Sequence, residues 1–248
     1  MVAYQGRYSD ASFELPAATE TSLRGLVTGA EEYRQTGRWL DLGFGEGGLL
    51  TVAARLGWHC FGTELAEASL AYGRNAGWTV SATPESDSRF AAGSFDVVSL
   101  IELLEHVPDP SSLLRSVVGW LRPGGVLLAT TPNALSLNAR LLRHEWSIIR
   151  PPEHCVIWTA AAARRACAQA GLSLVRLRSH GFNPSQLVSR FRKGREDFTV
   201  RQRNAAALAL NMAFTSNPAR RGVKALLNGL LSVTGLGDTL KLWAVRRS

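Results

Sequence analysis

The sequence predicts a doubly wound α/β fold, in which a mostly parallel sheet carries helices on both faces. Short apolar runs alternate with helix-like segments through the first half of the chain, and the run that ends at Leu42 leads directly into a glycine-rich turn. Such alternation is typical of parallel sheets that are buried on both sides. With 248 residues, of which 46% are hydrophobic, the chain is long enough to build such a core.

Each expected element follows from a local pattern. The first helix, 19–33, has apolar residues at helical spacing, and the helix 159–170 is alanine-rich and is followed by Gly171, a favourable residue after a helix end. The other helices are expected at 46–56, 66–76 and 110–121. Seven strands are expected, at 38–42, 58–63, 78–82, 95–100, 125–131, 172–179 and 238–246.

A long insertion separates the last two strands. We divide the chain into an N-terminal cap and helix (1–37), a core (38–181), an inserted helical lid (182–237) and the last strand (238–248). Helix-like segments fill the insertion at 184–193, 198–214 and 218–231, and connections of this length are usually functional. The insertion is therefore expected to act as a lid or a substrate subdomain.

The insertion also holds most of the net charge of +8, because it contains nine basic and two acidic residues. One interpretation is a solvated helical face. The other is a surface for an anionic substrate, a carrier protein, a nucleic acid or a membrane.

The cysteine count and the apolar runs exclude several classes of protein. Cys60, Cys155 and Cys167 form no C-x-x-C pair, which argues against a disulfide framework or a thiolate zinc site and favours a reducing compartment. No secretory-signal pattern begins the sequence, and the apolar run 205–214 is shorter than the roughly 20 residues that span a bilayer. We therefore expect a soluble, cytoplasmic protein without a transmembrane segment.

The glycine-rich turn predicts a nucleotide-type cofactor site. Glycines permit positive φ and a close approach of a ligand, and the following helix offers free N–H groups. Asp41 lies just before the turn, where its carboxylate can reach a cationic or amino group, and Glu64 ends the next strand, where it can bind a ribose. The glycines also fit the G-x-G-x-x-G spacing of nicotinamide-dependent reductases, so the turn alone leaves both cofactors open.

Motifs later in the sequence distinguish between the two cofactors. Ser94-Phe95-Asp96-Val97-Val98 and Leu121-Arg122-Pro123-Gly124-Gly125 follow the turn in order, and the strand 126–131 comes next. With these motifs the chain, over roughly residues 38–180, resembles class I S-adenosylmethionine-dependent methyltransferases. The resemblance implies a Rossmann-like methyltransferase fold whose last strand is antiparallel. It also implies S-adenosyl-L-methionine as the cofactor, bound by Asp41, Gly43, Gly45, Gly47, Glu64, Leu65, Thr83, Leu100 and Ile101.

A second cluster of polar residues follows the fourth strand. Glu102, Glu105 and His106 are spaced to share one face of a helical turn, and His154 precedes the helix at 159–170. This pattern resembles that of ubiquinone-biosynthesis O-methyltransferases and of the small-RNA 3′-terminal 2′-O-methyltransferases of plants and bacteria. In those groups the matching residues bind a divalent metal that holds two neighbouring substrate hydroxyls.

Two interpretations of this cluster stay open. Carboxylates and imidazoles suit magnesium or manganese, and they also allow iron, cobalt or zinc. Alternatively, the carboxylates stabilise a helix start, and His106, with His154, supplies acid–base catalysis without a metal.

The expected activity is transfer of a methyl group to an oxygen of a small or medium metabolite, such as a phenol, a catechol or a sugar hydroxyl of a natural product or glycan. Methylation of an RNA 2′-hydroxyl or of a metabolite nitrogen, a nicotinamide-dependent reduction and a non-catalytic binding role are the alternatives. The expected partner is a small-molecule acceptor, either anionic or carrier-bound; a nucleic acid is less favoured because the sequence contains no recognised RNA-binding module. The sequence does not determine the oligomeric state.

Overall fold

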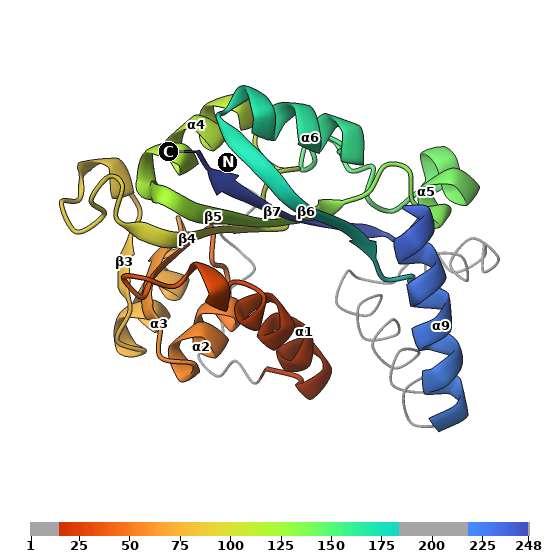
Figure 1. Ribbon diagram of the computed structural model, residues 1–248, viewed down its shortest axis with the longest axis horizontal. Helices are drawn as coiled ribbons and strands as arrows, with labels where there is room; N and C mark the ends of the chain where they lie inside the picture. The colour runs from red at the N-terminus through yellow and green to blue at the C-terminus, as the bar shows by residue number, and fades with distance from the viewer. Residues whose placement is uncertain (1–14, 184–217, 248) are drawn as a thin grey trace.

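The computed structural model describes residues 15–183 and 218–247, which form one seven-stranded sheet with helices on both faces (Figure 1). The strands are β1 (Arg38–Leu42), β2 (His59–Thr63), β3 (Thr79–Ser81), β4 (Phe95–Ile101), β5 (Leu121–Pro132), β6 (Leu172–His180) and β7 (Thr239–Arg246). The α-helices are α1 (Ala17–Thr28), α2 (Gly48–Arg55), α3 (Glu67–Asn75), α4 (Pro110–Trp120), α5 (Leu137–Leu142), α6 (Ala160–Gln169) and α9 (Pro218–Thr234).

The strand order is β3-β2-β1-β4-β5-β7-β6, and the first five strands run parallel. The chain reverses its direction of winding between β1 and β4, so the carboxyl ends of these two strands face a crevice of the kind in which doubly wound folds bind ligands. β7 runs antiparallel between β5 and β6, which confirms the expected orientation of the last strand.

The sheet is buried between two helical layers, with α1, α2 and α3 on one face and α4 and α6 on the other (Figure 1). Because successive strand residues point to opposite faces, Leu128 and Trp243 join the core on the α1 side, while Leu127 and Leu242 join the core on the α6 side. This double burial explains why β1, β4 and β5 are almost wholly apolar.

A buried carboxylate ties the N-terminal region to the sheet. One oxygen of Asp96 accepts hydrogen bonds from the backbone N–H groups of residues 35–37, and the other accepts the Nε–H of Arg122 at 2.6 Å. These donors lower the pKa of Asp96 against the opposing effect of burial. The Asp96 motif found in the sequence is therefore structural: it fixes the start of β1 and leaves the opposite strand end for ligands.

Three expectations need correction or remain outside the described residues. Residues 102–106 form a non-helical turn, because Glu102 has a φ of 50° in the left-handed region, which no helix accommodates. The expected helix 19–33 ends at Thr28, and a short 3-10 turn covers Glu31–Tyr33. The expected lid helices 184–193 and 198–214 lie outside the described residues, whereas the third corresponds to α9.

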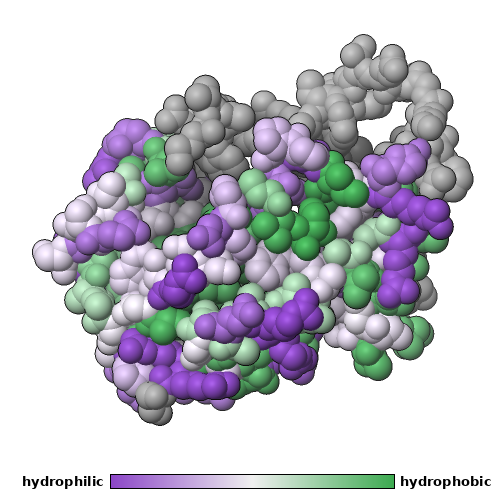
Figure 2. Space-filling view, turned by 90° about the horizontal axis from the view of Figure 1, so that it is seen from above, coloured by the Kyte–Doolittle hydropathy of each residue, from purple (hydrophilic) through white to green (hydrophobic). Residues whose placement is uncertain are grey.

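The three cysteines are all free, as expected. Within residues 15–183 and 218–247, no helix has the length and apolar character needed to cross a bilayer. Seen from above, hydrophilic side chains cover much of the surface and apolar ones emerge in small groups among them (Figure 2).

Candidate functional site

The glycine-rich turn joins β1 to α2 in a backbone conformation that only glycine adopts easily. Gly43, Gly45 and Gly47 have φ values of 65°, 55° and 76°. A Cβ on Gly47 would lie 2.7 Å from the ring of Trp78, so both the dihedral angle and the space require glycine there. Gly47 is followed directly by the first turn of α2, whose N–H groups are available to a ligand.

Glu64 holds this turn against the end of β2. One carboxylate oxygen accepts the Gly45 N–H at 3.0 Å, and the other accepts the Leu65 N–H at 2.7 Å. Glu64 is only 8% exposed. A carboxylate has about four acceptor positions, so the side chain keeps capacity for a ligand hydroxyl while it shapes the loop.

The Asp41 side chain is the last member of a series of buried hydrogen bonds beneath the glycine-rich turn. The Ser99 hydroxyl donates to the Asp41 carboxylate at 2.6 Å, and the Trp39 indole N–H donates to the Ser99 oxygen at 2.8 Å. Burial, opposed by the Ser99 hydrogen bond and assisted by the charge of Glu64, raises the pKa of Asp41 to about 7. A buried carboxylate of this kind favours a positively charged group beside it.

The other residues expected to bind the cofactor lie at the same edge of the sheet. Leu65 follows β2 and is 62% exposed, and Thr83 follows β3 on the surface. Leu100 and Ile101 end β4, with Leu100 fully buried. All of these residues therefore surround the carboxyl ends of β1 to β4.

The polar cluster after β4 contains two coupled carboxyl groups. The side chains of Glu102 and Glu105 share a hydrogen bond, and threonines at the end of β5 support them: Thr130 bonds Glu102, and the Thr131 hydroxyl donates to Glu105 at 2.9 Å. Glu105 is 2% exposed. Glu102 has part of its surface in contact with solvent, but protein atoms pack closely around its carboxyl group. Burial raises the pKa of both groups, and the charge of Glu105 raises that of Glu102 further, whereas hydrogen bonds with Thr131 and Glu102 lower that of Glu105. The two carboxyl groups therefore titrate as a pair.

The two histidines are oriented by backbone carbonyls. His106 Nδ1 lies 2.8 Å from the Glu153 carbonyl oxygen, and His154 Nδ1 bonds the carbonyl of Ile148. A carbonyl only accepts, so each Nδ1 carries a proton and Nε2 is the ring atom that can face a ligand. The rings lie 4.6 Å apart, and burial lowers the pKa of His154, which favours its neutral form.

Ligand atoms of Glu105, His106 and His154 all lie within 4.8 Å of one another. A carboxylate and two imidazoles whose Nδ1–H groups donate to backbone carbonyls form the kind of arrangement by which proteins hold divalent metals. Glu102 lies outside this group of three and shares a hydrogen bond with one of its members, Glu105. The sequence pattern pointed to all four residues but not to the supporting Thr130 and Thr131, whose only signal was their place at a strand end.

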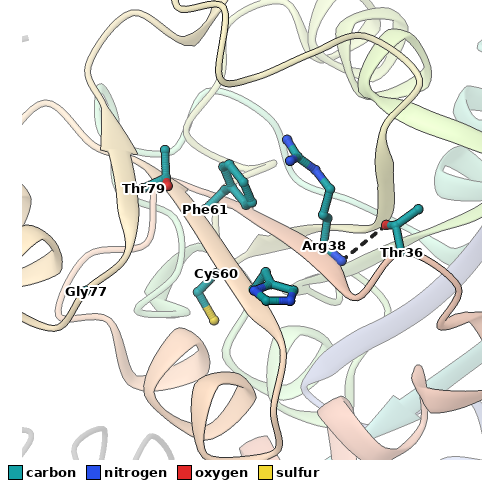
Figure 3. Close-up of a pocket in the computed structure, with 7 residues that line it drawn as sticks. Thr36, Arg38, Cys60, Phe61, Gly77 and Thr79 are labelled. Carbon is teal, nitrogen blue, oxygen red and sulfur yellow. Dashed lines mark hydrogen bonds between the residues drawn. The ribbon is translucent and has the colours of Figure 1, made fainter.

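One hollow in the structure is separate from this site. It has a volume of about 400 Å³ and lies at the amino ends of β1, β2 and β3, where Arg38, His59 and Thr79 line it (Figure 3). The Arg38 guanidinium lies over the rings of Phe61 and Phe95. This is the sheet edge opposite the glycine turn, so the hollow is not part of the cofactor site.

Comparison with known proteins agrees with this geometry. The family model of the methyltransferase domain matches residues 19–177. The ubiquinone biosynthesis O-methyltransferase of Aromatoleum aromaticum is 33% identical over 169 residues, covering 59% of this chain and 68% of the relative. The enzyme of the same name from Hahella chejuensis is 32% identical over 157 residues, covering 55% of this chain and 66% of the relative.

A solved structure supports the fold over nearly the whole chain. The S-adenosylmethionine-dependent methyltransferase from Archaeoglobus fulgidus superposes with a TM-score of 0.58 at 16% identity, covering 92% of this chain and 93% of the other. The chain belongs to the methyltransferase-domain family, and it is an S-adenosylmethionine-dependent methyltransferase. This assignment confirms the resemblance inferred from the motifs and rejects a nicotinamide-dependent reductase.

Proposed function

We propose that the protein methylates an oxygen of a small molecule that carries two adjacent hydroxyls, such as a catechol or a sugar diol. The observation that carries this proposal is the convergence of Glu105, His106 and His154 next to the cofactor end of β4. Two curated relatives named as O-methyltransferases support transfer to oxygen. Their whole length is only partly matched, so their acceptor is not assigned to this chain.

The cofactor is expected to lie over the carboxyl ends of β1 to β4. The amino group of its methionine part would face Asp41 and the glycine turn, and its ribose hydroxyls would bind Glu64. The adenine would pack on Leu65 near Thr83, and Leu100 and Ile101 would border the sulfonium. The solvent exposure of Leu65 supports this placement, because a bound aromatic ring would cover the side chain.

The chemistry requires alignment more than covalent help. The acceptor oxygen attacks the methyl carbon, the carbon–sulfur bond breaks as the carbon–oxygen bond forms, and S-adenosylhomocysteine leaves. Glu105, His106 and His154 would hold a divalent metal, magnesium or manganese, that lowers the pKa of the acceptor hydroxyls. Glu102, which shares a hydrogen bond with Glu105, would take the proton that the hydroxyl loses.

The direct test uses purified protein, radiolabelled S-adenosylmethionine and three acceptors: a catechol, a monophenol of similar size and a short RNA. We expect methylation of the catechol at the oxygen, with the monophenol at least about tenfold slower because it cannot occupy both positions at the metal. Equal rates for both phenols would contradict the diol requirement. A faster reaction with RNA would instead favour the 2′-hydroxyl alternative, and methylation confined to an amine would reject transfer to oxygen.

Cofactor binding should depend on pH through Asp41. Its raised pKa means that the free protein keeps this group protonated from its ordinary range up to about 7. The contribution of Asp41 to folding stability is therefore lost as the pH rises from that range to about 7 and does not change further above it. A cationic cofactor favours the ionised form. Its association constant should therefore rise about tenfold per pH unit below 7 and level off above it. Calorimetry at several pH values measures this rise, and Asp41→Asn should remove it; an unchanged rise in that variant would exclude Asp41.

A further inference from the structure

Two positive side chains lie directly opposite each other on neighbouring strands. Arg178 of β6 and Lys241 of β7 are register partners in an antiparallel pair, so their side chains leave the same face of the sheet. Like charges in this position repel and destabilise the pairing. Neither residue forms an ion pair with a carboxylate in the part of the chain that the structure describes.

Both residues line a hollow of about 490 Å³ on the α1 face of the sheet. Residues of β6, β7, α1 and the C-terminal part of α9 line the hollow. Arg176 also lines it but is already engaged, because it contacts Glu32 at 3.5 Å and lies over the Trp243 ring. Among the described residues, the lining contains no acidic side chain.

The hollow offers donors that lack a protein acceptor. Lys241 is half-buried, and burial lowers its pKa despite the nearby charge of Glu102. A half-buried cation without a partner costs free energy, and an anion that accepts hydrogen bonds from Lys241 would remove that cost.

The hollow adjoins the proposed catalytic cluster. Thr130 of β5 is the register partner of Lys241, so one row of side chains crosses the sheet from Thr130 through Lys241 to Arg178. Thr130 also accepts the Glu102 N–H at its carbonyl, 3.0 Å away, and its hydroxyl supports the Glu102 side chain. An acceptor held at Glu102 could therefore extend along this row into the hollow.

We propose that Lys241 and Arg178 bind an anionic group, a carboxylate or a phosphate, on the acceptor whose hydroxyl is methylated. This inference rests on the proposed function, because it assigns the substrate class of the same site. The two cations recognise the anion, while Glu102 and its neighbours hold the reacting hydroxyl at the other end of the row.

The test combines a kinetic ratio with a binding measurement that needs no activity. The first compares kcat/KM for 3,4-dihydroxybenzoate with that for its neutral methyl ester. The second compares the melting temperature in phosphate with that in sodium chloride of equal ionic strength. Variants are Lys241→Gln and Arg178→Gln, and Arg164→Gln on α6, an exposed cation on the opposite face, is the matched control.

For the unmodified protein we expect the acid to be favoured over the ester and phosphate to raise the melting temperature by a few degrees, about 3 °C. Lys241→Gln should reduce the acid-to-ester ratio roughly tenfold and remove the phosphate effect, whereas Arg164→Gln should change neither. Removing one of two opposed cations relieves repulsion, so neither hollow variant should melt earlier in chloride.

Other outcomes separate the two proposals. If neither phenol is methylated but the phosphate effect disappears in Lys241→Gln, the anion site stands and the proposed acceptor class is wrong. If the ratio and the phosphate effect persist in both hollow variants, the anion site is wrong, whatever the activity toward catechols.

Discussion

Incubation with excess chelator should abolish methyl transfer, and addition of magnesium or manganese should restore it. Glu105, His106 and His154 offer three ligand atoms within 4.8 Å, with both imidazoles oriented by backbone carbonyls. A coordinated hydroxyl ionises at a much lower pH than a free one, so loss of the metal should reduce kcat by about a thousandfold or more. Activity is measured with a catechol acceptor at saturating cofactor.

Single substitutions test whether the dependence on metal arises at this cluster. Glu105→Gln and His154→Asn should lose both activity and calorimetric binding of manganese, while binding of S-adenosylhomocysteine should persist. His144→Asn is the control, since His144 is an exposed histidine in the same stretch of chain and outside the cluster. Full activity in chelator, combined with inactivity of His106→Ala, would reject the metal and leave His106 as a general base.

The role of Glu102 in this cluster is the point at which sequence spacing misled. Its separation from Glu105 suggested one helical face, but its left-handed backbone directs the side chain toward Thr130 instead. A positive φ at a residue other than glycine costs free energy and leaves no trace in residue spacing. The structure therefore places Glu102 outside the group of three ligands, where its side chain hydrogen-bonds both Glu105 and Thr130.

The parts of the site that could be predicted are those encoded in short stretches. The glycine turn, Asp41 and Glu64 follow from one strand–turn–helix pattern, because the backbone there needs particular residues at particular positions. The pairing of Arg178 with Lys241 could not be anticipated in this way. It depends on the register between β6 and β7, and a shift of one residue would move either side chain to the other face.

The insertion shows a second limit of prediction from the sequence. Its length and charge suggested a lid, and of its three expected helices α9 alone belongs to the described residues. The cationic feature that the structure does describe lies in the sheet and not in the insertion, since Arg178 and Lys241 are strand residues. Charge density along a sequence carries no information on strand register, so it could not indicate that Arg178 and Lys241 face each other.

Replacement of Glu64 by alanine should weaken binding of S-adenosylmethionine by about a hundredfold. The carboxylate has two tasks, because it fixes the Gly45 and Leu65 N–H groups and is expected to accept the ribose hydroxyls. Hydrogen bonds to a charged group contribute about 1.5–3 kcal/mol each, so loss of the ribose contacts and relaxation of the turn together account for the size of the effect.

The affinity of Glu64→Gln should lie between those of Glu64→Ala and the unmodified protein, because the amide retains one acceptor oxygen. Glu67→Gln, an exposed carboxyl at the start of α3, should bind as the unmodified protein does. Calorimetric titration with S-adenosylhomocysteine measures all three variants, and an affinity within threefold of normal for Glu64→Ala would show that Glu64 only shapes the loop.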